Sequence, residues 1–201
     1  MSSVVAVSGS QGFIISSDSI VFKFLTDANG QVVGKIKGIT RKLFQIQDDI
    51  ITVGLGNWNT YFPIFNTVAS MNVSKNVMLD EIRTRGMKIT DTRICIFSRH
   101  DGNVTLDIVE NGQVRLAQTG AIMYPEQALN SMFLAMYESP DAMKIRMTGM
   151  LGMATLVHAY NLFASSLCSD ISAPFDTILF LQNGVFSFSG GTTRLPIGEF
   201  V

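Results

Sequence analysis

Ser2, the residue after the initiator methionine, is the first position in the sequence that could carry out chemistry. Methionine is readily removed before a small residue, and its removal would leave Ser2 with both a hydroxyl and a free α-amine. An α-amine has a pKa of about 8, so it can act as a general base at neutral pH. One residue then supplies nucleophile and base without a histidine. Many proteins begin Met-Ser, so the prediction of a nucleophile depends on the residues that follow.

Other catalytic and metal-binding signatures are missing from the sequence. Its only histidines are His100 and His158, and neither belongs to an HExxH motif. There is no CxxC pair, no G-x-S-x-G elbow and no glycine-rich phosphate loop after a strand. We expect His158, in an apolar helix, to be a satisfied core histidine. Cys95 and Cys168 share no motif and are interpreted as free buried thiols. We expect no metal ion and no cofactor.

The composition indicates a protein with a large core. The chain has 201 residues, of which 47% are hydrophobic and 15% charged, and we expect residues 1–201 to form one domain. Lys and Arg number 15 against 16 Asp and Glu, which gives no electrostatic reason to expect nucleic acid or a membrane surface. No apolar run reaches the roughly 18 residues of a membrane helix, and the start does not resemble a signal peptide. We therefore expect a soluble, cytoplasmic protein whose apolar surface is partly covered by partners.

The order of the predicted elements indicates a layered fold. Periodicity and turn residues predict strands at 4–8, 13–15, 20–25, 31–36, 43–46, 50–55, 93–97, 104–109, 114–117, 177–181 and 185–189. They predict helices at 58–69, 74–85, 126–138 and 142–167. Strands and helices are segregated along the chain, which favours an α+β fold. We expect a four-layer αββα sandwich, in which two antiparallel sheets pack face to face and each is covered by a helix pair.

The opening of the chain carries a recognisable pattern. A short strand from Ser2 and a second apolar strand lead into the small-residue step Ser16-Ser17-Asp18-Ser19. This opening resembles that of a proteasome β-type subunit or a bacterial proteasome-like N-terminal-nucleophile (Ntn) hydrolase. In that family a nucleophile begins the first strand and a catalytic aspartate follows the second. The spacing from Ser2 to Asp18 matches the family spacing.

Two later segments extend the resemblance. The stretch 39–46 resembles the family strand that carries the catalytic lysine, which here is Lys42. The next strand ends at Gly56, and its distance from Lys42 also fits the family. The interval from Asp18 to Lys42 is longer than usual, and a hairpin with its turn at 27–30 is expected to hold the insertion.

The resemblance implies a role for each matched residue. The ammonium of Lys42 would lie near the hydroxyl of Ser2 and lower the cost of forming the alkoxide. Asp18 would pair with Lys42 and hold it in place. The N–H of Gly56 would donate to the oxyanion of the tetrahedral intermediate. Ordinary structural roles stay open beside these, because an aspartate can cap a turn, a lysine can be solvated and a glycine can end a strand.

Positions near the third and fourth helices match the family less closely. Thr119 stands where the family has a serine whose hydroxyl supports the N-terminal amine. After the fourth helix the family has an aspartate and a serine three residues apart. Ser172 aligns with that serine, whereas Ser169 aligns with the aspartate and Asp170 lies one step away. Either a one-residue shift restores Asp170 to the site, or the site is altered.

Three residues match positions that line the family's first specificity pocket. These are Val21, Gly54 and Trp58, and together they predict an apolar pocket. Trp58 is equally compatible with helix packing. Lys35 and Lys37 are rivals for the role of the catalytic lysine, but both belong to the inserted hairpin.

The function implied by the resemblance is that of an N-terminal-serine endopeptidase of the threonine-protease type. Such a subunit would assemble with copies of itself into a ring, and an ATP-dependent unfoldase would supply it with unfolded polypeptide. A non-proteolytic Ntn amidase or transpeptidase and a catalytically silent structural subunit are the alternatives. The joint presence of Ser2, Asp18 and Lys42 argues against a silent subunit, whereas the displaced Asp170 argues for one.

Overall fold

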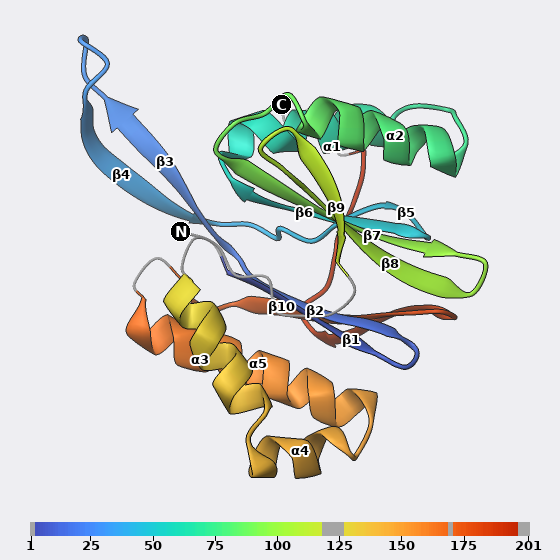
Figure 1. Cartoon of the computed structure of the whole chain (residues 1–201). Helices are drawn as coiled ribbons and strands as arrows, with labels where there is room; N and C mark the ends of the chain where they lie inside the picture. The colour runs from blue at the N-terminus through green and yellow to red at the C-terminus, as the bar shows by residue number, and fades with distance from the viewer. Residues whose placement is uncertain (1–2, 118–126, 169–170, 197–201) are drawn as a thin grey trace.

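Two hairpins of apolar strands form the first of three sheets in the described part of the chain (Figure 1). The computed structural model describes residues 3–117, 127–168 and 171–196. The first sheet has the order β1-β2-β10-β11 and is antiparallel throughout. Its strands are β1 (Val4–Gly9), β2 (Gly12–Asp18), β10 (Phe175–Leu181) and β11 (Gly184–Ser189).

The second sheet holds six strands in the order β12-β5-β6-β7-β8-β9. These strands are β12 (Thr193–Arg194), β5 (Phe44–Gln47), β6 (Ile50–Gly56), β7 (Thr92–His100), β8 (Asn103–Glu110) and β9 (Gln113–Ala117). Neighbours pair antiparallel except β12, which lies parallel to β5. Asp101-Gly102 and Asn111-Gly112 form the turns from β7 to β8 and from β8 to β9, and all four residues have positive φ.

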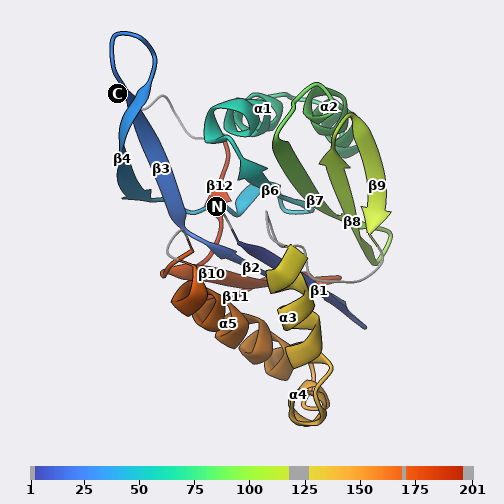
Figure 2. The same ribbon diagram turned by 60° about the vertical axis from the view of Figure 1, so that its left-hand side comes forward.

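The predicted insertion forms a third, two-stranded sheet. Strand β3 (Ile20–Thr26) pairs with β4 (Val32–Ile39), and Gly30 in the turn between them has a φ of 78°. Figures 1 and 2 show that this ribbon leaves the body of the molecule and projects away from it. We call β3 and β4 with their connecting turn the arm.

Five helices lie in the described ranges. They are α1 (Trp58–Ala69), α2 (Lys75–Gly86), α3 (Gln127–Tyr137), α4 (Pro140–Arg146) and α5 (Met150–Leu167). The prediction of one helix over 142–167 is wrong, because the chain breaks at Gly149 with a φ of 92° and α4 and α5 are separate. A positive φ is open to glycine at little cost, so this residue permits the break. None of the described helices has both the length and the apolar character needed to cross a membrane.

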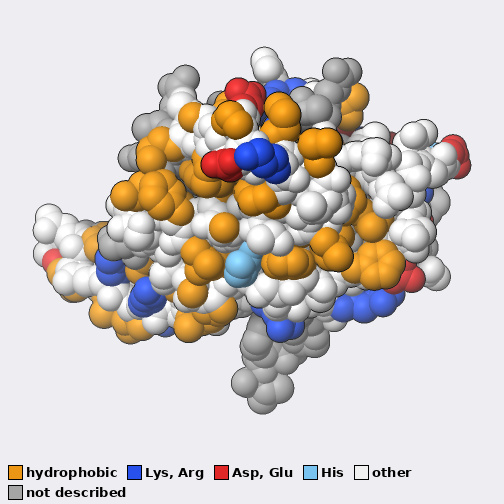
Figure 3. Space-filling model, turned by 90° about the horizontal axis from the view of Figure 1, so that it is seen from below, with side chains coloured by type: hydrophobic (Ala, Val, Ile, Leu, Met, Phe, Trp, Pro, Cys, Tyr) orange, Lys and Arg blue, Asp and Glu red, His pale blue; other side chains and the backbone are white. Residues whose placement is uncertain are grey.

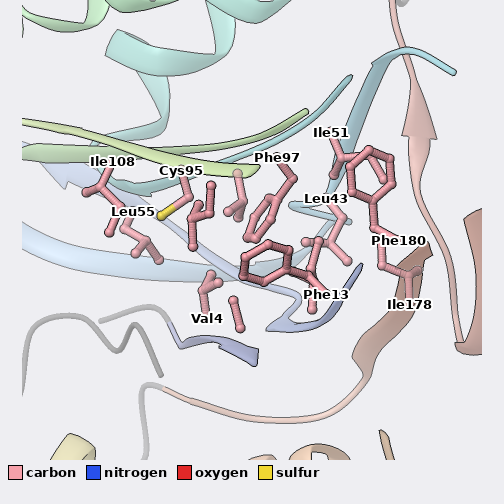
Figure 4. Packing of buried hydrophobic residues seen from close by; sticks show 14 residues of the cluster. Val4, Phe13, Leu43, Ile51, Leu55, Cys95, Phe97, Ile108, Ile178 and Phe180 are labelled. Carbon is pink, nitrogen blue, oxygen red and sulfur yellow. The ribbon is translucent and has the colours of Figure 1, made fainter. Parts of the chain in front are cut away.

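Three apolar clusters hold the elements together. The first lies between the two larger sheets, where Phe13 meets Phe97 edge to face with ring centroids 5.6 Å apart (Figure 4). The second joins the four-stranded sheet to α3 and α5, and the third joins the six-stranded sheet to α1 and α2. Val4 belongs to the first cluster and Val5 to the second, as the alternation of a strand buried on both faces requires. The mixed α and β composition agrees with the expected α+β class.

Candidate active site

A buried ion pair occupies the place where the four-stranded sheet meets the segment between β4 and β5. Asp18 is the last residue of β2, and Lys42 lies two residues before β5. Lys42 Nζ donates to both carboxylate oxygens of Asp18, at 3.0 Å and 2.9 Å. The side chain of Asp18 is 0% exposed and that of Lys42 is 1% exposed. The predicted catalytic lysine therefore contacts the predicted catalytic aspartate, although the arm lies between them in the sequence.

The backbone at the start of β1 completes the surroundings of Asp18. The N–H of Ser3 donates to Asp18 Oδ1 at 2.7 Å, and the N–H of Ile20 donates to Oδ2 at 3.2 Å. The N–H of Asp18 in turn donates to the carbonyl of Ser3 at 3.1 Å. Ser3 is joined directly to Ser2, so the carboxylate that binds Lys42 also binds the peptide unit next to the candidate nucleophile.

Burial dominates the electrostatics of this pair. Loss of hydration raises the pKa of Asp18, and the attraction of Lys42 together with the N–H donors of Ser3 and Ile20 opposes that rise. Loss of hydration likewise lowers the pKa of Lys42, against the attraction of Asp18. A lysine whose pKa is lowered gives up its proton more readily than one in water. Lys42 is thus suited to exchange a proton with a nearby hydroxyl.

Gly56 ends β6 in a conformation that requires glycine. Its φ is 119°, and a Cβ built there would lie 2.5 Å from the carbonyl oxygen of Asp91. The residue is exposed, so its N–H lies at the surface end of the strand. A side chain is excluded on both conformational and steric grounds. The role of its N–H as an oxyanion donor stays a prediction.

Two of the three predicted pocket residues have clear packing roles. A Cβ at Gly54 would lie 2.3 Å from the ring of Tyr61, so this glycine makes room for an aromatic ring of α1. Trp58 is half-buried and stacks on Phe62 with ring centroids 4.7 Å apart. Val21 is half-buried at the base of the arm, opposite Gly38. Helix packing therefore accounts for the position of Trp58, and the pocket itself stays a prediction.

Several predicted site residues lie outside the described residues. These are Ser2, Thr119, Ser169 and Asp170. Ser172 is described and half-buried, and its hydroxyl accepts a hydrogen bond from Lys37 Nζ at 2.9 Å.

The rival lysines of the arm have their own contacts. Lys37 reaches Ser172, and Lys35 Nζ lies 4.4 Å from the centroid of the Phe22 ring. The arm therefore directs Lys37 to the segment that follows α5. The lysine that binds Asp18 is Lys42.

A second buried carboxylate, Asp176, was missed by the sequence reasoning. Its oxygens accept from the Ser19 hydroxyl and from the N–H of Gly191, each at 3.0 Å. Arg41 Nε lies 3.4 Å from Asp176 Oδ1, and the arginine side chain is 52% exposed. Arg41 and Lys42 thus bind two different carboxylates on neighbouring strands. Two signals in the sequence could have indicated this arrangement. They are the adjacent basic residues Arg41-Lys42 and the Asp18-Ser19 step at the end of β2.

His158 and the two cysteines differ in how deeply they are buried. His158 is half-buried, with Nδ1 3.1 Å from the Thr177 hydroxyl, so it has a partner but is less enclosed than expected. Both cysteines are free, as expected. Cys95 is buried, and its burial raises the pKa of the thiol to about 12, whereas Cys168 is only half-buried.

The chain has a proteasome-like fold, which its likeness to a solved structure shows. That structure is a mutant of Anbu from Hyphomicrobium sp. strain MC1. The match has a TM-score of 0.67, covers 96% of this chain and 89% of that chain, and has 13% sequence identity. No family model and no curated protein matches the sequence. At this identity the likeness establishes the fold, and the function has to be argued from the site.

Proposed function

We propose that the protein is an N-terminal-serine hydrolase that cleaves peptide bonds, with Ser2 as nucleophile once Met1 is removed. The observation that supports this most strongly is the buried pair of Asp18 and Lys42, which is hydrogen-bonded through Asp18 to the backbone of Ser3. A buried ion pair is weak support for stability, since its desolvation offsets much of the attraction between the charges. Its place beside the N-terminus therefore favours a functional reason for keeping it.

The reaction that we propose is acyl transfer. The α-amine of Ser2 takes the hydroxyl proton while the Oγ attacks the substrate carbonyl, and the ammonium of Lys42 stabilises the negative charge. The N–H of Gly56 donates to the oxyanion. The C–N bond then breaks, the leaving amine takes the proton, and an ester with Ser2 remains. Water hydrolyses this ester by the reverse proton movements and regenerates the hydroxyl.

Further residues are assigned to this proposal with the roles implied by the resemblance. Thr119 would support the α-amine of Ser2, and Asp170 and Ser172 would complete the site. The fold proposed to carry them is the αββα sandwich of Ntn hydrolases. In support, Figure 1 has α1 and α2 over the six-stranded sheet, and α3 and α5 over the four-stranded one.

The substrate would bind in an apolar pocket. Val21, Gly54 and Trp58 would line it beside the nucleophile. Val21 lies in β3, which begins two residues after Asp18, and Gly54 lies two residues before Gly56 in β6. Unfolded polypeptide is the proposed substrate, supplied in the cytoplasm by an ATP-dependent unfoldase.

Assembly into a homo-oligomeric ring is part of the same proposal. The arm exposes apolar side chains on a ribbon that is marginally stable alone: Phe24 is 60% exposed, Val33 67% and Ile39 67%. Figure 3 shows further hydrophobic side chains on the face seen from below. Near the break between α4 and α5, Met147 and Leu151 are 83% and 66% exposed. Apolar surface of this kind typically marks protein interfaces. We therefore expect neighbouring copies to cover the arm.

Light scattering tests the assembly. The double variant Phe24→Ser, Val33→Ser should reduce the particle mass toward the 22.0 kDa of one chain. The matched control is Leu116→Ser on β9, which is 59% exposed and lies outside the arm. The control should leave the mass unchanged. A wild-type mass of one chain, or an unchanged mass in the double variant, would contradict the role of the arm.

Trapping of the acyl-enzyme tests the chemistry. Intact mass spectrometry first reports whether Met1 is gone. A peptide β-lactone should then acylate the protein once per chain, and fragmentation should locate the ester on Ser2. Ser2→Ala keeps a small residue after Met1 and so preserves its removal, but the variant should not be acylated. Labelling at another residue, or equal labelling of the variant, would overturn the nucleophile.

A further inference from the structure

A chain of hydrogen-bonded polar side chains crosses the otherwise apolar layer between α5 and the four-stranded sheet. The Ser3 hydroxyl donates to Asn161 Oδ1 at 2.9 Å, and Asn161 Nδ2 donates to the Ser16 hydroxyl at 2.5 Å. Ser16 Oγ lies 2.7 Å from Thr177 Oγ1. All four side chains are 0% exposed. The chain reaches the half-buried His158, whose Nδ1 is 3.1 Å from Thr177 Oγ1.

Asn161 is the unusual member of this chain. Its neighbours on the same face of α5, Val157, Tyr160 and Ala164, all pack into the apolar cluster against the sheet. A buried amide costs free energy unless its oxygen and nitrogen both find partners. Here Oδ1 accepts from Ser3 and Nδ2 donates to Ser16, so the amide has a fixed orientation and joins β2 to the residue before β1.

Ser3 is consequently held at all of its polar atoms. Its N–H donates to Asp18 Oδ1, its carbonyl accepts from the N–H of Asp18, and its hydroxyl donates to Asn161. The nitrogen of Ser3 is also the nitrogen of the peptide bond to Ser2. The nitrogen of that peptide bond is therefore fixed relative to the carboxylate that binds Lys42.

We propose that Asn161 is a positioning residue, which holds Ser3 so that Ser2 is presented to Lys42. This inference rests on the proposed function for its catalytic consequence. Misplacement of a reacting group by about 1 Å can reduce a rate by about 100-fold. The amide acts only through Ser3, so it should affect the rate of acyl transfer and leave substrate affinity alone.

Two matched variants separate positioning from stability. Ser3→Ala and Ser16→Ala each remove one buried hydroxyl that is hydrogen-bonded to the side-chain amide of Asn161. Each should shift the urea midpoint by a similar amount. Ser3→Ala should reduce kcat by about 100-fold with KM unchanged. Ser16→Ala leaves the bond between Ser3 and Asn161 intact and should alter kcat by less than about threefold. Equal losses of kcat in both variants, or none in Ser3→Ala, would overturn the inference.

A readout that needs no activity keeps the inference distinct from the proposed function. Hydrogen exchange of the amide of residue 3, resolved by fragmentation mass spectrometry, reports how firmly that residue is held. Ser3→Ala and Asn161→Ala should each speed this exchange by about tenfold or more, and Ser16→Ala should not. If exchange is fast in these two variants but the wild type has no hydrolase activity, the positioning role is supported and the proposed hydrolase function is refuted. Unchanged exchange in both variants refutes the positioning, whatever the activity.

Discussion

Replacement of Lys42 by methionine isolates the energetics of the buried pair. Methionine has a similar length and no charge, so Lys42→Met should fill the same space while it removes the ammonium that binds Asp18. Within the part of the chain that the structure describes, the carboxylate then keeps the N–H donors of Ser3 and Ile20. It stays buried, because none of its side chain is exposed in the native protein.

The size of the effect has an upper bound. A stranded carboxylate can always take up a proton, and an ordinary aspartate has a pKa of about 3.9, so protonation at pH 7 costs about 4 kcal/mol. The removal of one partner of a buried pair typically costs about 3–5 kcal/mol. The two N–H donors of Asp18 offset part of the loss. We therefore expect the free energy of unfolding to fall by about 3 kcal/mol at pH 7.

The loss of unfolding free energy in Lys42→Met should depend on pH. In Lys42→Met the folded state holds the Asp18 proton more tightly than the unfolded chain does, because burial raises the pKa of Asp18. A raised folded-state pKa means that stability is retained below the unfolded pKa and lost as the pH rises. Protonation at pH 5 costs only about 1.5 kcal/mol, so the destabilisation should shrink to that size or less.

Urea unfolding at pH 5 and pH 7 measures both values. The matched control is Arg41→Met, which breaks the neighbouring pair with Asp176, where the cation is 52% exposed. Exposed cations contribute little, so the control should lose about 1 kcal/mol or less. A loss below about 1 kcal/mol for Lys42→Met at pH 7, or the same loss at both pH values, would refute the reasoning about burial.

Two further predictions concern local geometry. Gly56→Ala should lower the unfolding free energy by more than about 1 kcal/mol, because it combines a φ of 119° with a Cβ 2.5 Å from the Asp91 carbonyl; a urea midpoint equal to wild type would contradict this. Iodoacetamide at pH 8 should modify Cys168 well before Cys95, whose burial raises the pKa of its thiol to about 12. Peptide mapping after labelling of native and unfolded protein checks this order, and equal labelling of the native thiols would count against it.

The sequence was most informative where the signals are local. The arm was predicted from its Asn-Gly turn, and Gly30 has the positive φ that such a turn needs. The polar residue just before α1 is a typical helix cap, and the side chain of Asn57 accepts from the N–H of Asn59 at 3.1 Å. The pairing of Asp18 with Lys42 came from spacing within a resembled family, and the contact between them is present.

The rest depended on contacts between distant parts of the chain. Asp176 meets Ser19, and Asn161 meets Ser3, across separations of 157 and 158 residues. No local pattern marks such pairs. The break at Gly149 was missed because a glycine in an apolar helical pattern costs only about 1 kcal/mol, so periodicity alone cannot tell a tolerated glycine from a break.

The most direct test of the proposed function is the hydrolysis of a fluorogenic peptide amide by wild type and Ser2→Ala. Both proteins should first be shown by intact mass to lack Met1, and their urea midpoints should agree. We expect turnover by the wild type and none above background in Ser2→Ala. Equal turnover by the two proteins would contradict Ser2 as nucleophile. A wild type that lacks Met1 and still releases no product would contradict the peptidase itself.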